Sequence, residues 1–169
     1  LVGQEDVWFN CRPSDSAVSI LTTDTFHGDW RVRGDIRSSI GVQRHVWLSV
    51  RTGALDLYLS SSMMSALRFE WTRLGMSGNE SELSHCTAFG EFGRPVWKSL
   101  PSFEFILGPN LVATVTPEDY VRADFGSGKC ALDLRESPLD GAVIIGWPIL
   151  RHFVTRFDAN MNKIEMCLV

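Results

Sequence analysis

A single acid stands in an apolar run near the middle of the chain, Ala54-Leu55-Asp56-Leu57-Tyr58-Leu59. A carboxylate can act as general base on a water molecule while a second carboxylate hydrogen-bonds the substrate carbonyl. Two such groups share one proton, because two like charges so close cannot both ionise. This stretch supplies only one of them. Asp56 is therefore either half of a catalytic pair, completed by a partner or a second copy, or an acid on a strand without a catalytic role.

Other residue types that can do chemistry show no productive spacing. Gly126-Ser127-Gly128-Lys129 lacks the Walker A pattern and is followed by β-forming residues, so a plain turn is expected. The histidines show no ligand spacing, and the cysteines form neither a CxxC pair nor a cysteine–histidine cluster at zinc spacing. We expect no metal and no cofactor.

The even number and wide spacing of the cysteines fit two disulfides in an oxidising compartment; the four are Cys11, Cys86, Cys130 and Cys167. The alternative is four buried free thiols in a cytosolic protein. Asn79-Glu80-Ser81 is a glycosylation sequon and favours the first interpretation. The sequence thus predicts a protein of the secretory pathway, extracellular or at the cell surface, glycosylated at Asn79.

The composition is that of one folded domain. The chain has 169 residues, of which 44% are hydrophobic and 21% charged, with a net charge of −4. No basic block is present, so nucleic acid is not expected as a partner. The longest apolar runs are too short to span a bilayer. Because the chain begins at Leu1 without a secretion signal, we expect a single unit, residues 1–169, excised from a longer protein.

Most segments show the alternation typical of strands. The expected strands are Val7-Trp8-Phe9, Val18–Leu21, Trp30–Arg33, His45–Val50, Ala54–Leu59, a hairpin of Phe103–Leu107 with Leu111–Val115, Ala142–Ile145 and a last hairpin over Thr155–Met166. Ala54–Leu59 is apolar on both faces, as in a central, buried strand.

A helix is expected after Ser60, which can act as its N-cap. Met63, Met64, Leu67 and Trp71 follow at helical spacing. A second short helix is expected within residues 148–153. The residues alone therefore predict a mostly β barrel or sandwich with one or two short helices.

Four segments resemble the C-terminal lobe of pepsin-like aspartic proteases, in the same order. They are Leu100-Pro101-Ser102-Phe103-Glu104-Phe105, Thr116-Pro117-Glu118-Asp119-Tyr120, Val143-Ile144-Ile145-Gly146, and Phe153–Asp158 with Asn162-Lys163-Ile164. In active members of that family, the hydrophobic-hydrophobic-Gly strand passes behind the catalytic loop. The resemblance implies a single lobe of the pepsin-like fold.

The same resemblance implies a pairing of the cysteines. The family's C-lobe disulfide flanks the first two segments as Cys86 and Cys130 do. Cys11 and Cys167 then remain by exclusion, and their bridge would tie the first strand to the last.

Two positions depart from the family's pattern. Where the family has its second Asp-Thr-Gly, this alignment places Asp56-Leu57-Tyr58. The lost hydroxyl would otherwise tie two loops together, and the lost glycine lets the backbone approach the carboxylates. Trp147 follows the hydrophobic-hydrophobic-Gly segment, where the family usually has Asp, Asn or Ser; it can fill space or face a partner.

These departures predict a catalytically inactive lobe, a pseudoprotease that binds protein within a larger secreted or surface protein. A lone lobe uncovers an apolar face that its sister lobe would cover. Trp8 with its neighbours, the last strand and Trp147 are the candidate partner face. The alternative is one half of an active aspartic endopeptidase, with Asp56 as one of two catalytic aspartates. A third possibility is an inhibitor or decoy of proteases.

Overall fold

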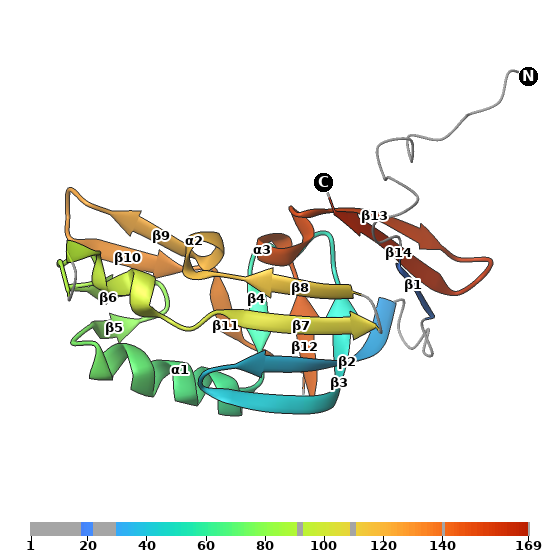
Figure 1. Ribbon diagram of the computed structural model, residues 1–169, viewed down its shortest axis with the longest axis horizontal. Helices are drawn as coiled ribbons and strands as arrows, with labels where there is room; N and C mark the ends of the chain where they lie inside the picture. The colour runs from blue at the N-terminus through green and yellow to red at the C-terminus, as the bar shows by residue number, and fades with distance from the viewer. Residues whose placement is uncertain (1–17, 22–29, 91–92, 109–110, 140, 169) are drawn as a thin grey trace, which may run out of the picture.

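The computed structural model of the chain describes residues 18–21, 30–90, 93–108, 111–139 and 141–168 (Figure 1). Within these ranges the chain is mostly β, with three sheets, three α-helices and one 3-10 helix. The predicted class, mostly β with short helices, is therefore confirmed at this level. The predicted strand Val7-Trp8-Phe9 lies outside the described residues.

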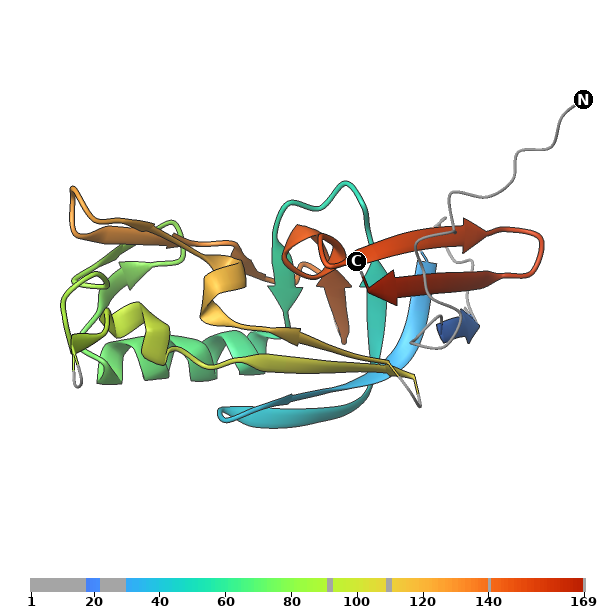
Figure 2. The same ribbon diagram turned by 45° about the horizontal axis from the view of Figure 1, so that its top comes forward.

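The largest sheet has seven strands and curls into a half-barrel at the centre of the molecule (Figures 1 and 2). Its order is β11 (Leu134–Glu136), β4 (Leu57–Leu59), β12 (Ala142–Ile145), β3 (Gly41–Val50), β2 (Trp30–Ser38), β7 (Phe103–Gly108) and β8 (Leu111–Val115). Neighbours are antiparallel except β11 with β4 and β12 with β3, which run parallel. Parallel neighbours need long connections, so this sheet joins distant parts of the sequence.

Two smaller sheets lie at opposite ends of the molecule (Figures 1 and 2). One has the order β5 (Ser77–Asn79), β6 (Glu82–Ser84), β10 (Lys129–Leu132) and β9 (Val121–Asp124). The other has the order β1 (Val18–Leu21), β14 (Lys163–Leu168) and β13 (Phe153–Asp158). The predicted last hairpin is thus present, and β14 pairs on both of its edges.

The predicted helix forms as α1 (Ser61–Arg73) with Ser60 as its N-cap. The Ser60 hydroxyl accepts from the Met63 N–H, and the buried side chains are the four that the spacing indicates, Met63, Met64, Leu67 and Trp71. The other helices are single turns: α2 (Pro117–Tyr120), α3 (Trp147–Leu150) and the 3-10 helix η4 (Val96–Ser99). None of the helices in the described part of the chain is both long and apolar enough to cross a membrane.

Local alternation gives the β7–β8 hairpin its buried face. Phe103, Phe105 and Leu107 from β7 are buried. So are Leu111, Ala113 and Val115 from β8, while the residues between them are more exposed. These six side chains join α1 and β12 in one hydrophobic core.

One strand prediction is wrong in its extent. The sequence predicts a strand from Ala54 to Leu59, but β4 begins only at Leu57. Ala54, Leu55 and Asp56 belong to the connection from β3, and the Leu55 side chain is 78% exposed. The reason is tertiary: β12 lies between β3 and β4, so the connecting chain must cross the end of β12 before it can pair again.

Candidate functional site

The connection between β3 and β4, residues 51–56, is the most unusual feature of the large sheet, and we call it the β3–β4 loop. The strand β12 runs parallel to β3, with Ile145 opposite Val50, and antiparallel to β4, with Ile144 opposite Tyr58. A strand from far along the sequence therefore separates two strands that are consecutive in the chain. The β3–β4 loop lies over the C-terminal end of that inserted strand.

Backbone hydrogen bonds hold the β3–β4 loop in place at its first residue and at Ala54. The Arg51 N–H donates to the Ile145 carbonyl at 3.0 Å. The Trp147 N–H donates to the Ala54 carbonyl at 2.9 Å. Both partners flank Gly146, so the end of β12 and the start of α3 together determine the path of the loop.

Gly146 allows the β3–β4 loop to lie directly against β12. A β-carbon at this position would lie 2.1 Å from the Asp56 carbonyl oxygen and 2.7 Å from the Ala54 carbonyl oxygen. Real side chains do not approach backbone atoms so closely, so only glycine fits without a shift. The glycine that ends the predicted buried strand therefore has a structural role, the seating of the loop.

A pocket of about 780 Å³ opens beside the β3–β4 loop. Aromatic and aliphatic side chains form much of its wall, and the loop supplies the rest. The lining residues are Trp30, Val50, Arg51, Thr52, Gly53, Ala54, Tyr58, Pro138, Ile144 and Phe157. The rings of Trp30 and Phe157 pack against each other, with centroids 5.1 Å apart.

Asp56, the acid that the sequence analysis singled out, lies at the end of the β3–β4 loop. Its carboxylate is 3.6 Å from the Arg135 guanidinium, measured from Oδ2 to Nε. Asp56 does not line the pocket, although Ala54 before it and Tyr58 after it do. The structure thus pairs Asp56 with a cation, and Arg51 is the residue of the β3–β4 loop that lines the pocket at the start of the loop.

Two large apolar side chains are exposed where the β3–β4 loop meets α3. Leu55 is 78% exposed and Trp147 is 55% exposed. The backbone bond from Trp147 to Ala54 holds these two segments together. Exposed apolar side chains that adjoin a pocket mark a place where another molecule can bind.

The other two predicted parts of the partner face are the last strand and Trp8. The last strand, β14, does not offer one: Ile164 and Met166 are fully buried, and Cys167 is 4% exposed. Trp8 lies outside the described residues. Of the parts of the predicted partner face that the structure describes, Trp147 is exposed and the apolar side chains of the last strand are buried.

A largely buried carboxylate, Asp119 on α2, contacts the two residues that follow α3. Asp119, 11% exposed, accepts hydrogen bonds from the Thr116 N–H at 2.7 Å and the Thr116 hydroxyl at 2.9 Å. Its other oxygen bonds the Arg151 guanidinium and lies 2.9 Å from His152 Nε2. Burial alone would raise the pKa of Asp119, but the bonds from Thr116 and Arg151 outweigh it and lower that pKa to about 2.

This depressed pKa predicts a specific loss of stability in acid. A carboxylate whose folded pKa lies below its unfolded value of 3.8 stabilises the fold above pH 4, and its contribution is lost as pH falls through about 2. The contribution is about 2 kcal/mol. We expect Asp119→Asn to lower the free energy of unfolding at pH 7 by about this amount and to flatten its decline below pH 4. Urea unfolding at pH 2 to 7 measures both.

Glu104→Gln is the control for that experiment. Glu104 is exposed on β7 and makes no hydrogen bond or ion pair among the residues described. The free energy of unfolding of Glu104→Gln should therefore show the same pH dependence as that of the wild type. If the free energy of unfolding of Asp119→Asn changed with pH in the same way as that of the wild type, the assigned role of Asp119 in acid stability would be contradicted.

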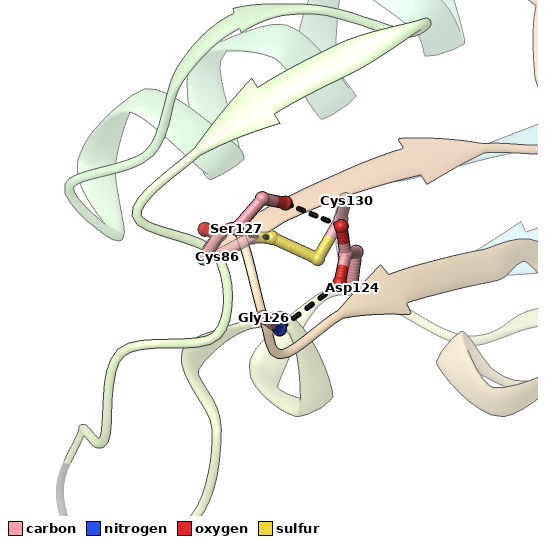
Figure 3. The surroundings of a disulfide bond; sticks show 6 residues. Cys86, Asp124, Gly126, Ser127 and Cys130 are labelled. Carbon is pink, nitrogen blue, oxygen red and sulfur yellow. Dashed lines mark hydrogen bonds between the residues drawn. A yellow bond between two sulfur atoms is a disulfide. The ribbon is translucent and has the colours of Figure 1, made fainter.

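The disulfide that the resemblance implies, Cys86–Cys130, is present, with the two Cα atoms 6.0 Å apart. It joins the segment after β6 to β10 (Figure 3). Beside it, the Asp124 carboxylate accepts from the Ser127 hydroxyl at 2.6 Å and from the Gly126 N–H at 2.9 Å (Figure 3). These bonds lower the pKa of Asp124 and hold the β9–β10 turn, so the Gly-Ser-Gly-Lys stretch is the plain turn that the sequence predicts.

Cys167 is also in a disulfide. The predicted pairing with Cys11 falls on a residue outside the described ranges. A disulfide such as Cys86–Cys130 is typical of proteins that fold in oxidising compartments. It therefore fits the predicted secretory localisation.

The sequon lies at the end of β5 and in the turn to β6, in the four-stranded sheet. Asn79 is exposed, and its Oδ1 accepts from the Ser81 N–H at 2.9 Å and from the Glu82 N–H at 3.2 Å. These bonds use the carbonyl oxygen of the amide. Among the described residues no bond uses its nitrogen, the atom to which an N-linked glycan is attached.

We expect Asn79 to carry a glycan when the chain is made in a eukaryotic secretory host. Endoglycosidase treatment should then shift the electrophoretic mobility of the wild type. Ser81→Thr preserves the sequon and should shift equally, whereas Asn79→Asp should not shift. The aspartate keeps the oxygen acceptor for both N–H groups, so the fold should survive. An unshifted wild type would contradict the prediction.

No group of three or more His, Cys, Asp or Glu side chains in the described part of the chain is arranged to hold a metal ion. The residues that the sequence analysis missed are Arg51, Thr52 and Gly53, which form the pocket side of the β3–β4 loop. The available signal was a Thr-Gly pair directly after a strand, a common turn pattern that carries little information alone.

Comparison with known proteins does not identify the chain. No protein-family model matches the sequence, and no curated protein matches it.

Proposed function

We propose that this chain is a catalytically inactive pepsin-like lobe that binds another protein chain through the β3–β4 loop and α3. In this proposal it is a disulfide-bonded glycoprotein module of a larger secreted or cell-surface protein. The observation that carries the proposal is the residue at the start of the β3–β4 loop, which is an arginine.

The relation between β12 and the β3–β4 loop supports a revised alignment with the family. In active pepsin-like enzymes the hydrophobic-hydrophobic-Gly strand passes behind the loop that opens with Asp-Thr-Gly. Here the loop over Gly146 opens with Arg51-Thr52-Gly53. In our proposal Thr52 and Gly53 are the family's Thr and Gly, and Arg51 replaces the aspartate. This alignment takes the place of the one that uses Asp56-Leu57-Tyr58.

An arginine at this position is incompatible with the two-carboxylate mechanism. The mechanism needs a group that accepts and returns a proton, with two carboxylates sharing one proton. A guanidinium stays protonated at every pH at which proteins are folded, and it has no acceptor atom. A permanent cation would also keep a facing carboxylate ionised. Arg51 therefore removes the acid–base function and leaves the loop scaffold in place.

The surface around the β3–β4 loop supports a protein-binding role. Leu55 and Trp147 are exposed beside a pocket whose wall includes Tyr58. Tryptophan and tyrosine dominate the energetics of many protein interfaces, because they bury a large area at a small cost in conformational entropy. We infer that a partner chain covers Leu55 and Trp147 and inserts a side chain into the pocket.

Peptide cleavage separates this proposal from the half-protease alternative. We expect no cleavage of a peptide pool between pH 3 and pH 7, either by the wild type or by Asp56→Asn. Light scattering on the same samples reports any dimer. Cleavage that follows a dimer peak and disappears in Asp56→Asn would make the chain one half of an aspartic endopeptidase and would overturn the proposal.

Site-specific crosslinking tests the binding surface itself. A photo-crosslinking amino acid at position 55 should yield a discrete adduct in the cells that make the protein. The matched control is position 125, where Phe125 is 64% exposed on the turn between β9 and β10. Trp147→Ala should abolish the adduct at position 55. Equal adducts at both positions, or an adduct that Trp147→Ala leaves unchanged, would exclude this surface.

A further inference from the structure

A second surface, on the hairpin of β2 and β3, concentrates arginines that have no carboxylate partner among the residues that the structure describes. We call the side of this hairpin that faces away from the core the hairpin face; it carries Arg33, Arg37, Arg44, His45 and Trp47. The hairpin runs along the lower edge of the molecule in Figures 1 and 2. It lies on different residues from the β3–β4 loop.

The register of the two strands shows that the arginines share one side. Val32 and Ile36 are buried, and Arg33 and Arg37, which alternate with them along β2, are exposed. On β3, Gln43 points toward α1, where its side-chain amide donates to Ser62 at 2.9 Å. Its neighbour Arg44 is exposed and therefore projects from the opposite side, with the arginines of β2.

The arginines of the hairpin face differ from most others in the molecule. An ion pair with a carboxylate engages six arginines elsewhere: Arg68, Arg73, Arg122, Arg135, Arg151 and Arg156. Within the described ranges no carboxylate lies within 4.0 Å of the guanidinium of Arg33, Arg37 or Arg44. An exposed guanidinium without a carboxylate partner can bind an oxyanion through two parallel N–H donors.

One of these guanidiniums is already held in position. Arg33 lies 3.8 Å from the centroid of the Trp47 ring and donates a hydrogen bond to the His45 carbonyl. A cation fixed on an aromatic face loses less side-chain freedom when it binds an anion. The remaining N–H donors of Arg33 are thus oriented before a ligand arrives.

The charge of the hairpin is opposite to that of the whole chain. Residues 30–50 contain four arginines and one aspartate, a net charge of +3, whereas the chain carries −4. The acid on the hairpin face is Asp35, whose Oδ1 accepts from the His45 N–H at 2.9 Å, and the adjoining strand β7 places Glu104 opposite Arg37. Positive charge is therefore segregated onto this surface, which favours a polyanionic ligand.

The sheet topology restricts how such a ligand binds. In the seven-stranded sheet β3 lies between β12 and β2, and β2 lies between β3 and β7. Along the described hairpin, β2 pairs with β7 over residues 35–38 and β3 pairs with β12 over residues 47–50, so an acidic peptide cannot add as a further strand along these stretches. Recognition by the hairpin face uses the N–H donors of its arginine side chains. Arg33 and Arg37 are about 14 Å apart along β2, from the rise per residue of a strand, so one ligand must present anions repeatedly along its length.

We propose that the hairpin face binds a sulfated polysaccharide of the heparin type. Its sulfate groups repeat along an extended chain and accept bidentate bonds from guanidinium groups. The Cys86–Cys130 disulfide fits an oxidising, extracellular setting, where such polysaccharides occur. Binding is through Arg33, Arg37 and Arg44, and the Trp47 ring supports the first of them.

Heparin affinity chromatography and titration of the full chain test this assignment. The wild type should be retained on heparin at a physiological salt concentration of about 0.15 M. The variant Arg33→Ser/Arg37→Ser/Arg44→Ser should bind heparin at least about tenfold more weakly. Its affinity should also depend less on salt, with the slope reduced by up to about three, by the counterion-release argument for polyanions.

The control variant removes the same charge elsewhere. Arg73→Ser/Arg122→Ser/Arg156→Ser changes three arginines that already have carboxylate partners, and it should bind heparin like the wild type. If both triple variants bound heparin equally weakly, the loss would be due to net charge alone, and the proposal would be overturned. Thermal unfolding of each variant confirms folding, since all six side chains are exposed.

Two further probes test the ligand class. Hyaluronan, which carries carboxylates but no sulfates, should bind weakly or not at all. Vesicles containing phosphatidylserine should not retain the protein. Hyaluronan binding as strong as heparin binding would overturn the sulfate assignment, and vesicle binding that the triple substitution abolishes would instead make the hairpin face a membrane-binding surface.

Discussion

Gly146→Ala is expected to destabilise the protein more than any other single methyl addition near the candidate site. The new β-carbon would lie 2.1 Å from the Asp56 carbonyl oxygen and 2.7 Å from that of Ala54. Both are backbone atoms, so neither can move aside by a change of rotamer. Displacing the β3–β4 loop would break its bond to Trp147, and burial among packed neighbours leaves little room for relaxation.

The size of this effect follows from known costs of overpacking. We expect a loss of about 3 kcal/mol or more in the free energy of unfolding. For a chain of this length the midpoint of thermal unfolding should fall by roughly 10 °C. Chemical denaturation and calorimetry measure the two quantities. Crosslinking at position 55 should also weaken, because the loop that carries Leu55 loses its support.

Gly53→Ala is the matched control, since the same substitution is made within the β3–β4 loop itself. A β-carbon at Gly53 would meet nothing within 4 Å, and its backbone does not have a left-handed conformation. Its effect should stay within about 0.5 kcal/mol. If Gly146→Ala were equally mild, the β3–β4 loop would not be seated on β12 as described.

Removal of the Cys86–Cys130 disulfide is expected to have the largest effect on stability overall. The bridge closes a segment with a sequence separation of 44 residues. In the chain-entropy model a loop of this length contributes about 4 kcal/mol, because the cross-link restricts the unfolded chain. The double variant Cys86→Ala/Cys130→Ala should lose about this much. Alanine is chosen because both positions are buried and a serine hydroxyl would need a partner there.

Denaturant unfolding of the double variant, with and without reductant, measures the contribution of this bridge. A reductant applied to the wild type also reaches the disulfide of Cys167, so the wild type should lose at least as much stability as the double variant loses by substitution. A loss below about 1 kcal/mol in the double variant would show that the unfolded chain is already compact around these residues.

Elements whose signals are local could be predicted from the sequence. The N-cap Ser60 and the apolar spacing of Met63 to Trp71 predict α1, and the helix buries those side chains. Alternation along residues 103–115 predicts the β7–β8 hairpin and its buried face. In each case the interactions that form the element lie within a few residues of one another, so the pattern is complete in the local sequence.

The candidate site was not predictable in this way. Alternation suggested that Ala54–Asp56 continue a strand, because the apolar residues there fit one. The structure places them in a loop over Gly146, and Arg51 beside the pocket. Only the insertion of β12 between β3 and β4 decides this. Residues about ninety positions apart bond there, as in the pair Arg51 and Ile145.

The sequence by itself thus determined α1 and the β7–β8 hairpin, together with the side chains that these elements bury, because periodicity and capping are local properties. The tertiary structure alone decided the order of strands in the seven-stranded sheet, the start of β4 and the path of the β3–β4 loop. The physical reason is that a strand inserted from far along the chain competes for the same backbone hydrogen bonds that neighbouring strands would otherwise form with each other. No local pattern records the outcome of that competition.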